Sequence, residues 1–343
     1  MSAEGAERRI RVGVVGAGYW GRNYVRSLGG LPEAELAWVC DLSEEARRRA
    51  ARLAPGARTT ASLEEMLAEP ALEAVVVATN AVHHHAHAAA ALRAGKHVLV
   101  EKPMAVTVAD AEALVRLAAE MGRTLMVGHL MLYHPAVERL RAMVASGELG
   151  RIYYLYALRV NLGRIRRDEN ALWSFAPHDL SIVLSLVGAA PESVAARGEC
   201  YLQPGIEDVV FVNLRFADGT MAQIQLSWLD PRKERRLTVV GSKKMVVFDD
   251  GHATEKLRVY DKGFVEPPEF STFGEYLSIR NGDIHIPHLE LGEPLRAECQ
   301  HFLRAIAKGE APRTSGEEGL RVVRLLAAAE QSMRQGGAPV RLG

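Results

Sequence analysis

The sequence has few cysteines, no excess of one charge and no long apolar run. Its 343 residues include three cysteines, Cys40, Cys200 and Cys299, which lie far apart and form no CxxC motif. Neither a disulfide framework nor a cysteine zinc site is indicated, which is typical of a reducing compartment. Lys plus Arg and Asp plus Glu both number 42, so the formal net charge is zero. We therefore do not expect a protein built mainly to bind nucleic acid or an anionic membrane surface.

Membrane-directing and repetitive segments are also missing from the sequence. No apolar run is long enough to span a bilayer, and the opening MSAEGAERRIRVGVVG has no segment of signal-peptide type. We therefore expect a cytoplasmic protein. There is no internal repeat and no low-complexity linker. With 48% apolar and 24% charged residues, the composition is that of a globular protein, and the length indicates two domains.

The first 128 residues alternate short apolar runs with helix-like stretches. The apolar runs are continuous and rich in Val and Leu, as in strands buried on both faces. They are RVGVVGAG, LAWVCD, LEAVVVAT, HVLVEK and TLMVGH. The stretches between them, such as TVADAEALVRLAAEMG, are rich in Ala, Leu, Glu and Arg. This series predicts an α/β domain over residues 1–128, a Rossmann fold with a doubly wound parallel sheet.

From residue 129 onward the rhythm changes to strand-like runs joined by turns. These runs include RIYYLYALRV, VVFVNLRF and TMAQIQLSWL. The turn signals are Asp218-Gly219, Gly241-Ser242 and Asn281-Gly282, the last predicting a further hairpin. Two helical stretches end the chain, and Ser315 with Glu318 would open the second as a capping box. We expect a mostly antiparallel α+β domain over residues 129–343.

A glycine loop joins the first predicted strand to the first helix. Gly16, Gly18 and Gly21 form a GxGxxG motif, which allows a tight turn, a close backbone approach to a pyrophosphate and close helix packing. Asp41, at the end of the second strand, would bind the ribose hydroxyls and repel a 2′-phosphate, which favours NAD over NADP. FAD uses the same fingerprint. The alternative is a simple turn, with Asp41 capping the helix that opens at Ser43.

The strand HVLVEK ends on a charged pair and a proline, Glu101, Lys102 and Pro103. Side chains at the carboxyl end of a parallel strand reach the crevice where doubly wound folds bind ligands. Lys102 would then lie beside the nicotinamide. A lone lysine at a strand end is more commonly solvated surface, so position alone does not assign it a function.

These motifs together resemble the Gfo/Idh/MocA family of NAD(P)-dependent oxidoreductases. The resemblance covers nearly the whole chain. Besides the glycine loop, its matching segments are VVVAT at 75–79, AGKHVLVEKP at 94–103, VGH at 127–129 and NALWSFAPHDL, which contains His178. The segment AGKHVLVEKP, at this distance from the glycine loop, is highly specific. The resemblance implies a second domain with a large open sheet, C-terminal helices that pack back on the first domain, and a homodimer or homotetramer formed through that sheet.

The resemblance also assigns catalytic roles. It implies that Lys102 lies by the nicotinamide and the substrate hydroxyl, that the Lys102-Pro103 peptide bond is cis, and that His178 is the catalytic histidine. Where the family usually has an aspartate, this sequence has Ser174, which can hydrogen-bond a sugar hydroxyl but cannot be a carboxylate base. Asp179 is expected to point elsewhere. The alternative for His178 is a helix-start histidine satisfied by backbone.

The expected site residues fall into two groups. Those expected to bind the cofactor are Gly16, Gly18, Tyr19, Trp20, Gly21, Asp41, Thr79, Asn80, His84, Glu101, Lys102 and His129. Those expected to face the substrate are Lys102, Tyr133, Asn161, Arg164, Asn170, Trp173, Ser174 and His178. The reaction would be oxidation of a secondary alcohol, with hydride passing to the nicotinamide, His178 as general base or acid and Lys102 polarising the oxygen.

A histidine run invites a metal hypothesis. His83 and His87 lie at i and i+4 of a predicted helix, with His84 and His85 between them, but no acid or cysteine nearby completes a ligand set. We therefore expect no metal.

The substrate class is predicted from two short sequence segments and from a group of positive charges. LWSFAPHD and GHLMLYHPAV are closest to nucleotide-sugar members of the family, such as the 3-dehydrogenase of UDP-N-acetylglucosaminuronic acid. Four arginines before the catalytic segment would suit an anionic substrate. They are Arg159, Arg164, Arg166 and Arg167. The alternative for these arginines is a solvated strand edge and loop. The alternative functions are an inositol or free-sugar dehydrogenase of the same family and a non-enzymatic NAD-binding regulator.

Overall fold

The chain forms two compact units in the computed structural model, which describes residues 8–163, 165–167, 169–265 and 278–342. The first unit comprises Met1–Tyr133 and Gly292–Arg324, and the second comprises His134–Leu291 and Leu325–Gly343. The division therefore falls just after the boundary expected near residue 129, and a later segment joins the first unit. Helix α8 (Pro294–Lys308) belongs to that segment and packs against α1 (Gly21–Gly29).

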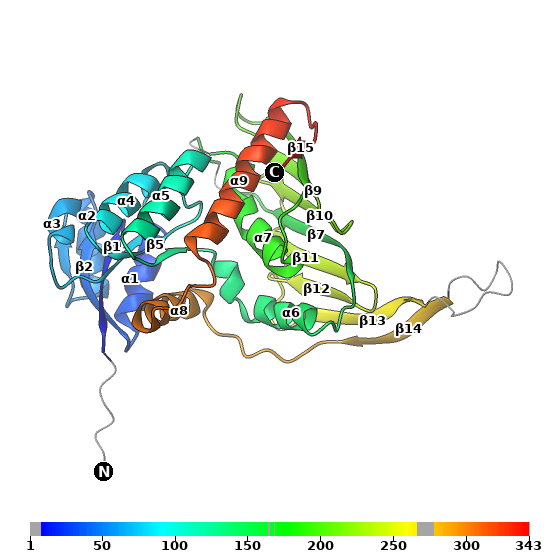
Figure 1. The fold of residues 1–343 in the computed structure, drawn as a ribbon, viewed down its shortest axis with the longest axis horizontal. Coiled ribbons are helices and arrows are strands. Elements are labelled where there is room, and N and C mark those ends of the chain that lie inside the picture. The colour runs from blue at the N-terminus through cyan, green and yellow to red at the C-terminus, as the bar shows by residue number, and fades with distance from the viewer. Residues whose placement is uncertain (1–7, 164, 168, 266–277, 343) are drawn as a thin grey trace, which may run out of the picture. The chain divides into compact units, whose positions relative to one another are not determined.

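The first unit contains a six-stranded parallel sheet in the order β3-β2-β1-β4-β5-β6. Figure 1 labels β1, β2 and β5 of this sheet, with helices such as α1, α4 and α5 around them. Its strands are β1 (Ile10–Val15), β2 (Ala34–Cys40), β3 (Arg58–Thr60), β4 (Ala74–Val77), β5 (His97–Val100) and β6 (Leu125–Val127). The Val-rich runs form central strands because both of their faces are covered, and every residue of β4 is 0% exposed. The predicted doubly wound sheet is confirmed.

Helices α1, α2 and α8 pack together in this unit, as do α4 and α5. The remaining elements are α2 (Glu44–Leu53), α3 (Leu63–Leu67), η1 (Ala81–His83), α4 (His84–Arg93), α5 (Val108–Glu120), η2 (Leu130–Tyr133) and the start of α9 (Gly316–Arg334). At the start of α9 the Ser315 hydroxyl accepts from the Glu318 amide at 3.4 Å, which is one of the two hydrogen bonds of the expected capping box. Strand β1 lies between β2 and β4, so the strand order reverses there. Ligands of doubly wound folds bind at this switch point.

The second unit contains a nine-stranded sheet in the order β14-β13-β12-β11-β7-β10-β9-β8-β15. Strands β7 and β10 run parallel, and the other described pairs are antiparallel, which confirms the predicted α+β class. The strands are β7 (Ile152–Val160), β8 (Ser193–Glu199), β9 (Val209–Arg215), β10 (Met221–Ser227), β11 (Glu234–Gly241), β12 (Met245–Asp249), β13 (Leu257–Val265), β14 (Ser278–His285) and β15 (Val340–Arg341).

Helices cover one face of this sheet. Helix α7 (Ala171–Val187) packs on β7, β9 and β10, and α6 (Pro135–Ala145) packs on β12. Large apolar side chains elsewhere on the central strands are exposed, namely Tyr154, Tyr156, Phe211 and Met221. Cross-strand pairing puts Met221 beside Tyr154 in register. The sheet therefore has one covered face and one open face that is partly apolar.

Two of the three predicted turns join adjacent strands. Asp218-Gly219 joins β9 to β10, with Gly219 at φ +85°, and Gly241-Ser242 joins β11 to β12. The hairpin predicted at Asn281-Gly282 is wrong, because both residues lie inside β14. The glycine is needed for packing instead. A Cβ on Gly282 would lie 2.4 Å from the carbonyl oxygen of Asp261, where the register shifts.

Among the described residues, no helix combines the length and the apolar character needed to cross a bilayer.

Candidate active site

The glycine loop has the geometry that dinucleotide binding requires. Gly16 has φ +86°, and a Cβ there would lie 2.8 Å from the Ala78 carbonyl oxygen. A Cβ on Gly21 would lie 1.8 Å from the Gly16 carbonyl oxygen, so only glycine allows helix α1 to begin there. Around Gly18, by contrast, no described atom lies within 4 Å of a Cβ position. The loop is thus closed at its turn and open at Gly18, where a pyrophosphate would approach.

The start of helix α1 is suited to an anion. Its N-cap residue, Trp20, makes no capping hydrogen bond through its side chain to a described residue, and the first turn carries no acidic residue. Amide groups at such a helix start favour a phosphate. Tyr19, 76% exposed, and Trp20, 36% exposed, border this end of the loop.

Asp41 connects the glycine loop to the second helix. Its Oδ2 accepts from the Ala17 amide at 2.6 Å, and its Oδ1 accepts from the Ser43 amide at 2.8 Å. The Ser43 hydroxyl in turn caps α2, accepting from Ala46 at 3.3 Å. Asp41 therefore supports the turn before α2, and its carboxylate lies beside the glycine loop; its binding of a ribose stays a prediction.

Lys102 lies two residues after the end of strand β5 and is half-buried. The Lys102-Pro103 peptide bond is cis, as the resemblance implied. The Lys102 amide donates to Glu101 Oε2 at 3.0 Å, and Glu101 Oε1 accepts from the indole nitrogen of Trp20. Glu101 thus links the lysine's backbone to the glycine loop.

His129 lies close enough to Lys102 for the two charges to interact. It is 1% exposed, and neither ring nitrogen has a hydrogen-bond partner among the described residues. Burial, followed by the positive charge of Lys102, lowers the pKa of His129 to about 3. His129 is therefore a neutral imidazole at neutral pH.

The segment after β4 is held together by His84. Its Nδ1 is 2.8 Å from the Pro103 carbonyl oxygen and its Nε2 is 2.9 Å from the Thr79 carbonyl oxygen. At 1% exposure, both ring nitrogens are occupied by backbone, so any part of His84 in cofactor binding would be indirect. It ties Thr79 to the turn that carries Lys102. Asn80, next to Thr79, is exposed.

The other histidines of this segment make contacts of their own. The rings of His83 and His87 lie 5.8 Å apart, and His85 lies 3.5 Å from Asp110. Burial, followed by the charge of His83, lowers the pKa of His87. In the part of the chain that the structure describes, no group of three or more metal-ligating side chains is assembled.

Helix α7 carries the predicted substrate residues of the second unit. Asn170 caps it, with Oδ1 accepting from the Trp173 amide at 3.1 Å and Nδ2 donating to Glu207 at 2.7 Å. Its amide is thus used by the protein. Ser174 and His178 are one turn apart and share a helix face, with Ser174 buried and His178 half-buried. Trp173 is half-exposed beside them.

One predicted substrate residue, Tyr133, is placed differently from expectation. Tyr133 is 3% exposed, its hydroxyl lies 3.1 Å from that of Thr314, and the Arg313 guanidinium lies 5.0 Å from its ring centre. Tyr133 therefore packs inside the first unit, and its hydroxyl is not presented to a sugar. Asn161 is half-exposed just after β7, and Arg164 lies outside the described residues.

Among the three arginines before the catalytic segment that the structure describes, Arg159 and Arg166 form ion pairs. Arg159 makes a bidentate pair with Asp179, and Arg166 lies 2.9 Å from Glu169. Because the first pair is buried, Arg159 is not available to a diphosphate, contrary to the expectation for it. Asp179 points toward Arg159, as expected of a residue that does not replace the missing aspartate.

Two site-supporting residues, Tyr24 and Glu298, were missed by the sequence analysis. Tyr24 on α1 and Glu298 on α8 are both 0% exposed. The Tyr24 hydroxyl is hydrogen-bonded to both Glu101 and Glu298. The sequence signal that could have identified Glu298 is an acidic residue within an apolar stripe of the helix. That stripe contains Leu295, Cys299, Phe302 and Leu303.

Two family models match the chain. One, described as "Oxidoreductase family, NAD-binding Rossmann fold", matches residues 10–129, and the other, the GFO/IDH/MocA C-terminal domain, matches residues 137–247. UDP-N-acetylglucosamine 3-dehydrogenase of Acidithiobacillus ferrooxidans is 30% identical over 325 residues, covering 94% of this chain and 96% of that enzyme. The chain belongs to the Gfo/Idh/MocA family of oxidoreductases. It is an NAD(P)-dependent dehydrogenase with an NAD-binding Rossmann domain.

Other members of the Gfo/Idh/MocA family are similar over nearly their whole length. Inositol 2-dehydrogenase 2 of Paenarthrobacter aurescens is 28% identical, covering 97% of this chain and 98% of that enzyme. The solved structure of the Acidithiobacillus enzyme has a TM-score of 0.80 at 26% identity, covering 95% of this chain and 98% of that chain. GenD2 from gentamicin A biosynthesis, solved with NAD, has a TM-score of 0.82 at 25% identity, covering 98% and 97%. These relatives mark a sugar and polyol dehydrogenase family.

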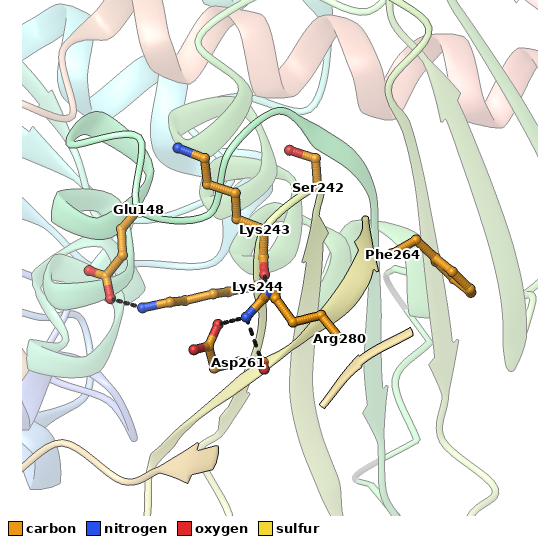
Figure 2. A pocket seen from close by; sticks show the side chains of 7 residues that line it. All are labelled: Glu148, Ser242, Lys243, Lys244, Asp261, Phe264 and Arg280. Carbon is orange, nitrogen blue, oxygen red and sulfur yellow. Dashed lines mark hydrogen bonds and ion pairs between the residues drawn. The ribbon is translucent and has the colours of Figure 1, made fainter. Parts of the chain in front are cut away.

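A hollow on the second unit of this Gfo/Idh/MocA protein contains none of the predicted site residues. It has a volume of about 480 Å³ and is lined by Glu148, Ser242, Lys243, Lys244, Asp261, Phe264 and Arg280. Figure 2 shows two ion pairs within it: Lys244 lies 3.0 Å from Glu148, and Arg280 bonds to Asp261. Paired, solvent-exposed charges give little binding energy, so we do not assign the active site to this hollow.

Proposed function

We propose that this protein oxidises the C3 hydroxyl of a UDP-linked N-acetylhexosamine, or of its uronic acid, with NAD. The observation that carries the reaction type is the fixed position of Lys102, whose neighbour Glu101 is bonded to Trp20 of the glycine loop. The choice of sugar is supported by similarity to UDP-N-acetylglucosamine 3-dehydrogenase over nearly the full length of both chains.

The proposed roles follow from the chemistry of each side chain. Bound NAD supplies the hydride acceptor. The Lys102 ammonium would stabilise the oxygen as negative charge develops on it. His178 would take the hydroxyl proton, because an imidazole titrates near neutral pH. Ser174, one helical turn away, would hydrogen-bond a neighbouring hydroxyl, and Asp179 takes no part because Arg159 holds both its oxygens.

An inositol or free sugar is the second candidate substrate. It is favoured by the similarity to inositol 2-dehydrogenase 2 and by the ion pair of Arg159, which removes one cation from a diphosphate site. The two candidates differ in what they predict for UDP itself. Only a nucleotide-sugar enzyme should be stabilised by UDP without a sugar.

The deciding experiment combines thermal shift with NADH formation. The protein would be tested with NAD and each of UDP-N-acetylglucosamine, its uronic acid, free N-acetylglucosamine and myo-inositol. We expect UDP alone to raise the melting temperature, NADH to form only with the UDP-sugars, and the product to carry a C3 ketone by NMR. NADH formation with myo-inositol and indifference to every nucleotide would rule out the proposed substrate in favour of the second.

We also infer that the open face of the nine-stranded sheet forms a subunit interface. Tyr154, Tyr156, Phe211 and Met221 are all at least 39% exposed on adjoining strands, and an apolar patch of this kind is costly to leave in water. Light scattering should show a dimer or tetramer. Replacing Tyr156 and Phe211 with Glu should yield monomers, whereas a monomeric wild type would contradict the inference.

A further inference from the structure

The Tyr24 hydroxyl lies between two buried carboxyl groups. It is 2.7 Å from Oε1 of Glu101 and 3.1 Å from Oε2 of Glu298. The three groups come from different elements of the first unit: helix α1, the end of strand β5 and helix α8. Tyr24 and Glu298 are 0% exposed and Glu101 is 8% exposed, so water cannot readily complete their hydrogen bonds.

Counting hydrogens determines which group donates. A tyrosine hydroxyl carries one hydrogen, so two hydrogen bonds among these three groups require a second hydrogen on one carboxyl. Glu101 accepts from Tyr24, from the Trp20 indole and from the Lys102 amide, a set of three donors that suits a carboxylate. Glu298 is left as the group that must donate. Its other oxygen, Oε1, has no partner among the described residues, which costs less for a neutral carbonyl oxygen than for an anion.

We propose that Glu298 is a neutral carboxylic acid that donates a hydrogen bond to Tyr24, and that it is a positioning residue for the active site. Through Tyr24 it fixes Glu101. Glu101 in turn holds the Lys102 backbone and, through Trp20, the glycine loop. The positioning role rests on the proposed function of Lys102, while the protonation of Glu298 does not.

The electrostatic surroundings agree with this assignment. Burial, followed by the negative charge of Glu101, raises the pKa of Glu298 well above its usual value. Burial and the two carboxyls likewise raise the pKa of Tyr24. The neighbouring Cys299 thiol also has its pKa raised by burial, and toward the start of α8 Glu293 raises and Arg296 lowers the pKa of that thiol. Glu298 thus faces Tyr24, Glu101 and Cys299, none of which is a cation.

The protonation is tested by comparing the wild type with Glu298→Gln in thermal melts of the protein without ligands, from about pH 5 to about pH 9. An acid with a raised folded-state pKa stabilises the fold fully below its unfolded pKa, and this contribution is lost as pH rises through the folded pKa. Glutamine keeps a donor and never ionises. We therefore expect the melting temperature of Glu298→Gln, relative to wild type, to increase with pH. A difference that is constant or that falls with pH would overturn the proposal.

The positioning role is tested by NAD affinity, which does not depend on knowing the sugar. Glu298→Leu fills a similar volume without a donor and should raise the NAD dissociation constant about fivefold or more, whereas Glu298→Gln should stay within about twofold of wild type. Glu293→Gln, at the N-cap of the same helix and in an exposed pair with Arg26, is the matched control and should match wild type. Unchanged NAD affinity in a folded Glu298→Leu variant would overturn the positioning role.

The same variants separate this inference from the proposed function. If no sugar is oxidised by any variant but NAD affinity and the pH series behave as described, the proposed substrate is wrong and the role of Glu298 in shaping the cofactor site is supported. If a UDP-sugar is oxidised and Glu298→Leu keeps wild-type turnover across the pH range, the positioning role is wrong and the proposed function survives.

Discussion

Asp179 accepts from Nε of Arg159 at 2.6 Å and from Nη2 of the same guanidinium at 3.0 Å. Both side chains are nearly buried, at 6% and 5% exposure. Removing one partner leaves an unpaired buried charge, so we predict that Asp179→Ala lowers the free energy of unfolding by ~3–5 kcal/mol. Denaturant unfolding measures the change.

Replacing both members of this pair tests the cause. The Arg159→Met, Asp179→Leu double variant should recover much of the lost stability, because no charge is left unpaired. Breaking the more exposed pair of Arg166 and Glu169 by Arg166→Met is the control and should cost less than ~1 kcal/mol. A similarly small effect of Asp179→Ala would show that the buried pair does not hold helix α7 on its sheet.

Lys102→Met and His178→Asn should each lower turnover of the sugar substrate by at least about tenfold while NAD binding survives. The first removes the charge that stabilises the developing alkoxide, and the second removes the proton acceptor. Steady-state NADH formation and NAD titration provide the two measurements. Lys96→Met is a matched control, because Lys96 precedes the opposite end of the same strand and its ammonium donates to the Glu69 carbonyl oxygen. Near wild-type turnover in both site variants would rule out the proposed roles of Lys102 and His178.

Replacing the glycines of the loop with alanine should have different effects on stability and NAD affinity at the two positions Gly18 and Gly21. Gly18→Ala meets no described atom within 4 Å, so stability should change by less than ~0.5 kcal/mol while the NAD dissociation constant rises about tenfold. Gly21→Ala would put a Cβ 1.8 Å from the Gly16 carbonyl oxygen and should cost at least ~2 kcal/mol of stability. Melting curves with and without NAD distinguish the two. Equal loss of stability in both variants would mean that Gly18 is needed for folding rather than for binding.

His129 should make the fold sensitive to acid. Its pKa is lowered from 6.5 to about 3, so between these two pH values the imidazole is protonated in the unfolded chain and neutral in the folded protein. The stabilisation that comes from keeping it neutral is present above about pH 6.5 and is lost as pH falls toward about 3. We predict that His129→Phe loses less stability than wild type between neutral pH and about pH 4.5. Urea unfolding at both pH values measures this, with His85→Asn, a half-exposed histidine, as control. Parallel losses in wild type and His129→Phe would contradict the prediction.

Local patterns in the sequence predicted the elements that carry the cofactor. Continuous Val runs predicted the buried parallel strands because burial on both faces leaves no polar alternation, and the GxGxxG spacing predicted a turn whose geometry the structure confirms. Asn281-Gly282 was misread because the same dipeptide that favours a hairpin also fits a strand position where another backbone comes close.

Side-chain partners far apart in the sequence were the part that patterns could not predict. Arg159 looked like a substrate-binding cation because nothing local indicated that Asp179 would face it across a helix and a strand. Tyr133 looked accessible because the segment that buries it, with Thr314 and Arg313, arrives from the end of the chain. Such pairings depend on tertiary packing, which a single sequence read by periodicity does not contain.

We infer that the Asp41 carboxylate couples cofactor choice to the shape of the glycine loop. One of its oxygens is already bonded to the Ala17 amide of the glycine loop. An engineer who replaced Asp41 with a neutral residue to admit a 2′-phosphate would also release that amide and loosen the turn. Redesign for NADP would therefore need a second change that restores an acceptor for the Ala17 amide. We expect a single substitution at position 41 to weaken the binding of both NAD and NADP.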